Sequence, residues 1–199
     1  RAVGGGRDDV MDLSAIAVAA ALAWGAGLRA YAVIFAVGIA GAAGWIELPE
    51  HLELLERPIV LAASGFMTLV EIFADKVPWL DSLWDAIHSF IRIPAGAALA
   101  AAVFGDSGLA VAAAAAILGG TLSAAVHVAK SGARATINTS PEPLSNWGAS
   151  LAEDVAVPLG LWLAFAHPLA FLALLAAFLI VAALLARLIW RGLKGRFST

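Results

Sequence analysis

The chain has 199 residues, of which 62% are hydrophobic and only 14% are charged, and its mean hydropathy is +0.91. A water-soluble domain usually carries about a quarter charged residues and less than half apolar ones, which excludes a soluble enzyme and a disordered chain. The net charge of -3 and the dispersed basic residues also exclude a nucleic-acid partner. Without cysteine, there is no disulfide or thiolate metal site. The composition predicts an all-α integral membrane protein, with the lipid bilayer as a partner.

Six apolar stretches are candidates for membrane crossings, because a hydrocarbon core of about 30 Å needs roughly 20 apolar helical residues. The first, residues 13–46, is too long for one straight helix and is interrupted at residues 25–27, Gly-Ala-Gly. It predicts either a broken span or a re-entrant hairpin. We therefore expect about six transmembrane helices, some broken or half-length, in one transmembrane domain over residues 13–190. The other five stretches are 58–76, 80–104, 108–130, 145–166 and 168–190.

Polar segments flank the transmembrane domain at both ends. Residues 1–12 form a polar N-terminal segment, and residues 191–199 form a basic tail. Loops on the cytoplasmic side of a membrane carry an excess of Lys and Arg, and one side collects most of the basic residues if the spans alternate. This rule predicts a multi-pass protein of an inner (plasma) membrane with a cytoplasmic C-terminus. A re-entrant first stretch would move only the N-terminus to the outside.

Two parts of the chain resemble each other. The segment Ile-Arg-Ile-Pro-Ala-Gly at 91–96 matches Val-Ala-Val-Pro-Leu-Gly at 155–160, and each follows an amphipathic stretch. The match predicts an internal repeat with units at about 58–104 and 108–166, an arrangement by which some transporters build a site between two halves. Chance similarity between alanine-rich helices is the alternative. Pro94 and Pro158 are expected to kink or unwind their helices.

Charged side chains lie inside the apolar stretches or at their ends. A charge at the bilayer centre is unfavourable by about 2.5 to 3.5 kcal/mol, so such residues usually face a cavity. Glu71 lies well inside its stretch and is the central acid of the predicted site, unless it only forms a structural ion pair with Lys76, Lys130 or Arg29. The other candidates fall near the same membrane boundary and predict a charge-balanced polar vestibule for substrate binding or transport: Asp75, Lys76, Asp81, Asp85, His88, Arg92, His127, Lys130, Arg134, Asn146, Glu153, Asp154 and Arg29.

Helical spacing supports one part of this vestibule. Asp81, Asp85, His88 and Arg92 are spaced so that they share one face of a helix, although a helix lying in the membrane interface would show the same pattern. The carboxylates and histidines offer enough ligands for a divalent cation. Their spacing is not diagnostic and basic residues lie nearby, so we expect no cofactor and keep a divalent cation as the alternative.

Several short motifs follow one another along the chain. They are Glu-x-x-x-Asp-Lys at 71–76, Asp-x-x-Trp-Asp at 81–85, Pro-x-Gly at 94–96, Ser-Pro-Glu-Pro at 140–143 and Glu-Asp at 153–154. As a set they resemble a bacterial multispanning inner-membrane family that is catalogued as a domain of unknown function. The resemblance implies a multi-pass protein whose polar residues form its functional core, and it implies no activity.

Three functions fit this pattern. The first is a small transporter or channel-like carrier for an anionic or zwitterionic solute or a lipid head group, with Glu71 exchanging a proton with His127 or His88. The second is a membrane-embedded enzyme acting on a lipid phosphate, which the chain supports less because it contains no Walker loop, nucleophile elbow or zincin helix. The third is a non-catalytic scaffold that packs through its small residues. A homo-oligomer fits all three.

Overall fold

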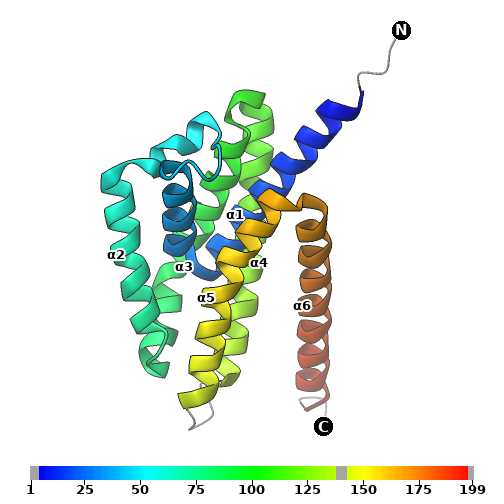
Figure 1. Ribbon diagram of the computed structural model, residues 1–199. Coiled ribbons are helices and arrows are strands. Elements are labelled where there is room, and N and C mark those ends of the chain that lie inside the picture. The colour runs from blue at the N-terminus through cyan, green and yellow to red at the C-terminus, as the bar shows by residue number, and fades with distance from the viewer. Residues whose placement is uncertain (1–4, 138–142, 197–199) are drawn as a thin grey trace.

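The structure, a computed structural model, describes residues 5–137 and 143–196 (Figure 1), and all regular elements in these ranges are helices. This confirms the expected all-α fold. By length and apolar composition, five helices are able to cross a membrane, and η1 with α2 forms a bent pair that makes a sixth candidate. The elements are α1 (Gly5–Ala42), η1 (Glu50–Glu56), α2 (Pro58–Ala74), α3 (Pro78–Val103), η2 (Gly105–Ser107), α4 (Leu109–Ile137), α5 (Pro143–Ala166) and α6 (Pro168–Arg196).

Helix α1 folds back on itself inside the bundle. Its backbone leaves the helical region at Arg29 (φ -149, ψ 84), and Figure 1 shows the second arm returning to the side on which the first arm began. A Cβ atom on Gly25 would lie 2.6 Å from the Val33 side chain, whereas eight residues of a straight helix span about 12 Å. The first stretch therefore folds as a helical hairpin and not as one straight helix, and its break lies just after the glycines that suggested it.

Helices α2 to α6 run alternately down and up between two faces of the bundle (Figure 1). The upper face carries both ends of α1 together with η1 and η2, and the lower face carries the α2–α3 and α4–α5 junctions. Helices α3 and α5 continue through Pro94 and Pro158. The expected unwinding at the prolines is thus wrong, because each proline is accommodated within a continuous helix. The pairs α2–α3 and α4–α5 run in the same directions, and the internal repeat remains a prediction.

Small residues bring α3 and α4 into close contact. A Cβ atom on Gly96 would lie 2.5 Å from Ser123 Cβ, and one on Gly119 would lie 2.8 Å from the Gly96 carbonyl oxygen. Only glycine permits backbones to approach this closely, which is how helices associate where no hydrophobic effect drives them together. Part of the alanine- and glycine-rich surfaces that suggested a scaffold is therefore used for packing within the chain.

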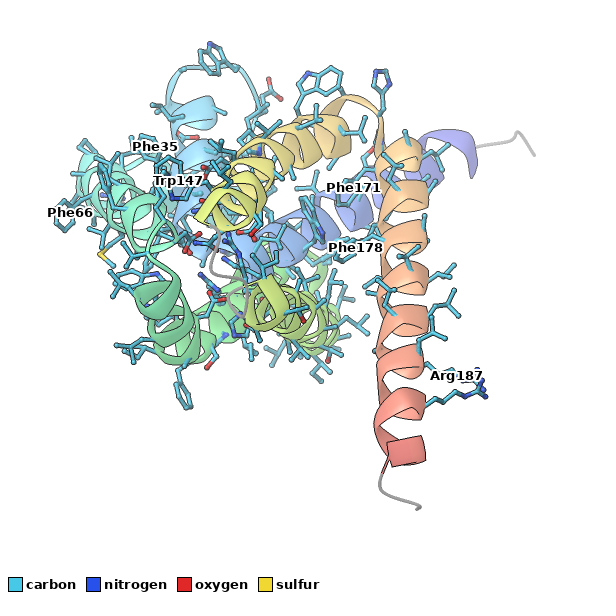
Figure 2. The ribbon with its side chains drawn as sticks, turned by 90° about the horizontal axis from the view of Figure 1, so that it is seen from below. Phe35, Phe66, Trp147, Phe171, Phe178 and Arg187 are labelled. Atoms are coloured by element: carbon cyan, nitrogen blue, oxygen red, sulfur yellow. The ribbon has the colours of Figure 1, made fainter. Side chains whose placement is uncertain are left out.

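Helix α6 packs on the bundle only through its first turns. Phe171 and Leu175 are buried, and they contact a core formed mainly by α1 and α5. Farther along, Phe178, Leu184 and Leu188 are exposed, and Figure 2 shows this part of α6 diverging from the other helices. An apolar surface of this kind suits contact with lipid chains. The sites of polar chemistry therefore lie in the other five helices.

Candidate functional site

Arg92 of α3 is the centre of the first group of buried charges. Its side chain is 1% exposed, and its Nη2 lies 2.6 Å from Glu71 Oε1 of α2. Its Nη1 donates a hydrogen bond to Asp85 Oδ1, two turns earlier on the same face of α3, and lies 3.3 Å from His127 Nδ1 of α4. We call Arg92, Glu71, Asp85 and His127 the Arg92 cluster. One guanidinium thus holds two carboxylates, and it draws α2, α3 and α4 together.

Arg29 is the centre of a second group, at the tip of the α1 hairpin. Its Nη2 lies 2.8 Å from Asp75 Oδ2 and 3.2 Å from Asp154 Oδ1, and it donates a hydrogen bond of 3.0 Å to Ser150 Oγ. The Arg29 side chain is also 1% exposed. The break in α1 thus places the positive charge of Arg29 next to carboxylates at the end of α2 and on α5.

Arg134 of α4 extends this second group towards the lower face. Its Nη2 lies 3.2 Å from Glu153 Oε1, and its Nη1 donates a hydrogen bond of 2.6 Å to Asn146 Oδ1. The Asn146 amide in turn donates to the backbone carbonyl of Asp75, at 2.8 Å. We call Arg29, Asp75, Arg134, Glu153, Asp154, Asn146 and Ser150 the Arg29 cluster.

Lys130 of α4 links the two clusters. Its Nζ lies 3.6 Å from Asp85 Oδ1 of the Arg92 cluster, and 3.0 Å from Glu153 Oε2 and 3.7 Å from Asp75 Oδ2 of the Arg29 cluster. It also donates a hydrogen bond of 3.1 Å to the carbonyl of Leu28, the last residue before the α1 break. The Lys130 side chain is fully buried. Both clusters therefore form one network, which contains five carboxylates and four basic side chains.

The amphipathic pattern of α3 explains why these charges are inside. Asp85, His88 and Arg92 are buried, whereas Leu83 and Ile87 on the opposite face are about half exposed. In a membrane the apolar face turns towards the lipid chains and the polar face towards other helices. The same sequence pattern in a soluble protein would place the charges outside.

A cleft of about 330 Å³ reaches the network between α3 and α4. Asp85 and Arg134 supply opposite charges to its wall, and the remaining lining residues are Ala86, Ser89, His127, Ser131 and Ala135. Several buried atoms of the network have no hydrogen-bond partner among the described residues: Arg29 Nε and Nη1, Glu71 Oε2, Asp75 Oδ1 and Oδ2, Arg92 Nε and Glu153 Oε2. Buried polar atoms are normally satisfied, so the network has hydrogen-bonding capacity to offer a ligand.

The sequence profile of one protein family, described as "Domain of unknown function (DUF4126)", matches residues 16–188. The chain belongs to this family. No curated protein and no solved structure matches the chain. The matched range of DUF4126 includes every residue of the charge network, so the family profile and the motif resemblance cover the same site.

Most of the site residues predicted from the DUF4126 sequence lie in one network, two described residues lie outside it, and the side chain of one is not described. Lys76 donates to the carbonyl of Ile72 in its own helix, at 3.0 Å, and it is not among the ion pairs of the network. His88 is buried and stacks on Trp84 with ring centroids 3.9 Å apart. The Asp81 side chain lies outside the described residues, as does the Ser-Pro-Glu-Pro loop up to residue 142.

The predicted partners of Glu71 require a correction. We expected Lys76, Lys130 or Arg29 as its structural partner, and the structure pairs it with Arg92 instead. Arg29 pairs with Asp75, one helical turn farther along α2, because the α1 break places its side chain at that level.

Two contributors to the site were not predicted. Ser123 is fully buried and donates a hydrogen bond of 2.9 Å to the Arg92 carbonyl, and its spacing from His127 and Lys130 on one face of α4 was an available signal. The Leu28 carbonyl had no such signal, since it is exposed to Lys130 only by the break in the helix.

The described residues contain no group of three or more His, Cys, Asp or Glu side chains placed to hold a metal ion. The acids of the DUF4126 network face arginine or lysine instead.

Proposed function

We propose that this DUF4126 protein is a small carrier that moves a zwitterionic or anionic solute, or the head group of a lipid, across the inner membrane of a bacterium. The observation that supports the proposal most is the tip of the α1 hairpin, which ends inside a buried charge network next to an open cleft. Transporters commonly bind their substrates where a helix is discontinuous near the middle of the membrane.

The electrostatic cost of the network supports the same proposal. Replacing buried ion pairs by apolar residues of similar size is often neutral or stabilising, so stability alone does not explain nine charged residues among transmembrane helices. Charges within a membrane usually mark a pathway for ions or solutes. A carrier gives them a purpose that packing does not.

The mixed charge of the cleft favours a solute with both signs. Asp85 offers a carboxylate and Arg134 a guanidinium on the wall of one cavity. Neither side chain is free, because Asp85 pairs with Arg92 and Arg134 pairs with Glu153. A zwitterion can exchange with such pairs without leaving an uncompensated charge. Glu71 Oε2, which lacks a hydrogen-bond partner, is the acid that fits proton coupling.

We further infer that the lower face of Figure 1 is cytoplasmic. Outside the network, Lys76 lies at the lower end of α2 and Arg187 and Arg191 lie towards the lower end of α6, whereas Arg57 lies at the upper face. The excess of basic residues on one side is typical of the cytoplasmic side. The end of α6 is then inside, and the start of α1 is outside.

The proposal is tested by ligand-induced stabilisation of the purified protein in detergent. The wild type and Glu71→Gln are unfolded thermally with glycine, phosphoethanolamine, inorganic phosphate or magnesium chloride. A solute that binds only the folded protein adds about 2.7 kcal/mol at one hundred times its dissociation constant. We expect glycine or phosphoethanolamine to stabilise the wild type, and Glu71→Gln to abolish the effect.

The matched control is Glu47→Gln, which changes an exposed glutamate in the loop before η1. It should respond like the wild type. A wild type that no zwitterion or anion stabilises would contradict the carrier, as would a full response in Glu71→Gln. Uptake of the active solute by proteoliposomes then separates transport from binding alone.

A further inference from the structure

The surroundings of the Lys130 ammonium form a cradle of four oxygen atoms. They are the Leu28 carbonyl oxygen at 3.1 Å, Glu153 Oε2 at 3.0 Å, Asp85 Oδ1 at 3.6 Å and Asp75 Oδ2 at 3.7 Å. The carbonyl is at the C-terminal end of a half-helix, where the partial negative charge of the helix dipole favours a cation. Three helices and the hairpin tip thus converge on one positive group.

Lys130 does not form hydrogen bonds with all four oxygen atoms of the cradle. Its hydrogen bond goes to the Leu28 carbonyl, whereas Asp75 Oδ2 and Glu153 Oε2 have no hydrogen bond although basic groups lie near them. Asp75 Oδ1, on a side chain that is 0% exposed, also has no hydrogen-bond partner among the described residues. The cradle therefore holds more buried acceptors than one lysine satisfies.

The cradle adjoins the cleft between α3 and α4. Asp85 belongs to both, since it lines the cleft and lies near Lys130 Nζ. Glu153 contacts Lys130 through Oε2 and Arg134 through Oε1, so an ammonium position and a guanidinium on the cleft wall flank a single carboxylate. A short zwitterion can therefore reach the cradle with its amine while its anionic end stays near Arg134.

We propose that the cradle is the subsite for a primary ammonium group of the solute, and that the Lys130 ammonium occupies it until the solute displaces that side chain. The inference rests on the carrier function proposed above and narrows its solutes to primary amines. An ammonium with three N–H donors fits the cradle, because the carbonyl and the carboxylates all accept hydrogen bonds. A trimethylammonium group has no donor for them.

The direct test replaces Lys130 by alanine and adds the deleted part of its side chain to the solution as a small ammonium ion. Lys130→Ala removes three carbons and the ammonium, which is the composition of n-propylammonium. We expect n-propylammonium chloride to raise the melting temperature of Lys130→Ala by about 5 °C or more at saturation, and guanidinium or tetramethylammonium to fail. Lys76→Ala, whose lysine bonds only its own helix, is the matched control and should not respond to n-propylammonium.

A second measurement uses the wild type, so that the test survives if Lys130→Ala does not fold. Glycine is compared with its N,N,N-trimethyl form, betaine, and phosphoethanolamine is compared with phosphocholine. We expect the primary amine of each pair to stabilise the protein and the trimethylated form to leave its melting temperature unchanged.

The outcomes separate the subsite from the carrier. Equal stabilisation by both members of each pair, or a folded Lys130→Ala that ignores n-propylammonium, overturns the amine subsite and leaves the carrier intact. Rescue of Lys130→Ala together with a wild type that no zwitterion stabilises would support the cradle and contradict the carrier.

Discussion

Two contacts between a basic and an acidic side chain lie in opposite surroundings. On the upper face, His51 Nε2 and Asp106 Oδ1 lie 3.2 Å apart, and the two side chains are 49% and 72% exposed. In the bundle, Arg92 Nη2 and Glu71 Oε1 lie 2.6 Å apart, and both side chains are 1% exposed. Water competes for the first pair, whereas the second pair has only protein groups as partners.

The difference shows that the effect of a charged pair on stability depends on whether water or protein surrounds it. An exposed pair contributes about 0 to 1 kcal/mol to stability, so the upper face can gain or lose such pairs freely. A buried pair depends on its partner, because one charge left alone is costly. The buried network is therefore sensitive to the loss of any member, and the carrier proposed above gives its charges a role.

The largest expected effect comes from Arg92→Ala. This change leaves Glu71 and Asp85 without their shared partner, and breaking a buried pair costs about 3 to 5 kcal/mol. The loss is measured as the change in the free energy of unfolding by denaturant in detergent. Arg57→Ala, at an exposed position before α2, is the control, and equal stability of the two variants would contradict the assigned role of Arg92.

An intermediate effect is expected from Gly27→Ala, which adds no charge. The new Cβ would lie 2.6 Å from the Ser123 carbonyl oxygen and 2.8 Å from Val126 Cβ, and overpacking of this kind costs about 1 to 3 kcal/mol. The change should also displace the hairpin tip from the network. Gly132→Ala, where a Cβ meets open space, should be nearly neutral, and a neutral Gly27→Ala would show that the tip is not closely packed.

The smallest effect is expected from Asp106→Asn on the upper face. Because both partners are largely exposed, the change should cost less than about 1 kcal/mol, and the cost should fall as salt is added. Unfolding at low and high ionic strength measures both. A loss as large as that of Arg92→Ala would remove the distinction between the two regions.

Much of the fold could be predicted because it depends on local patterns. The length of each apolar stretch predicts its helix, and the prolines at 58, 78, 143 and 168 each lie at the start of a helix in the structure. The path of α1 could not be read in this way. A break at Arg29 and a break at the neighbouring glycines look alike in sequence, and only the contact of Gly25 with Val33 shows that the arms fold back.

The candidate site was predictable as a set of residues and not as a set of partners. Charges on apolar helices are rare enough to be noticed singly, which is why Arg29, Glu71 and Lys130 were selected from the sequence. Pairing depends on the depth and rotation of each helix, and these are set by close packing between backbones. The prediction of the partner of Glu71 was therefore wrong, although both Glu71 and its actual partner Arg92 had been selected.

The hairpin also sets an order for assembly during synthesis. Arg29 is made before any of the carboxylates that surround it, and its hydrogen-bond partner Ser150 follows 121 residues later. A charged side chain among transmembrane helices needs partners, so the surroundings of the α1 tip are complete only after α5 has been inserted. In a chain truncated before α5, Arg29 would keep Asp75 as a partner and would lose Asp154 and Ser150.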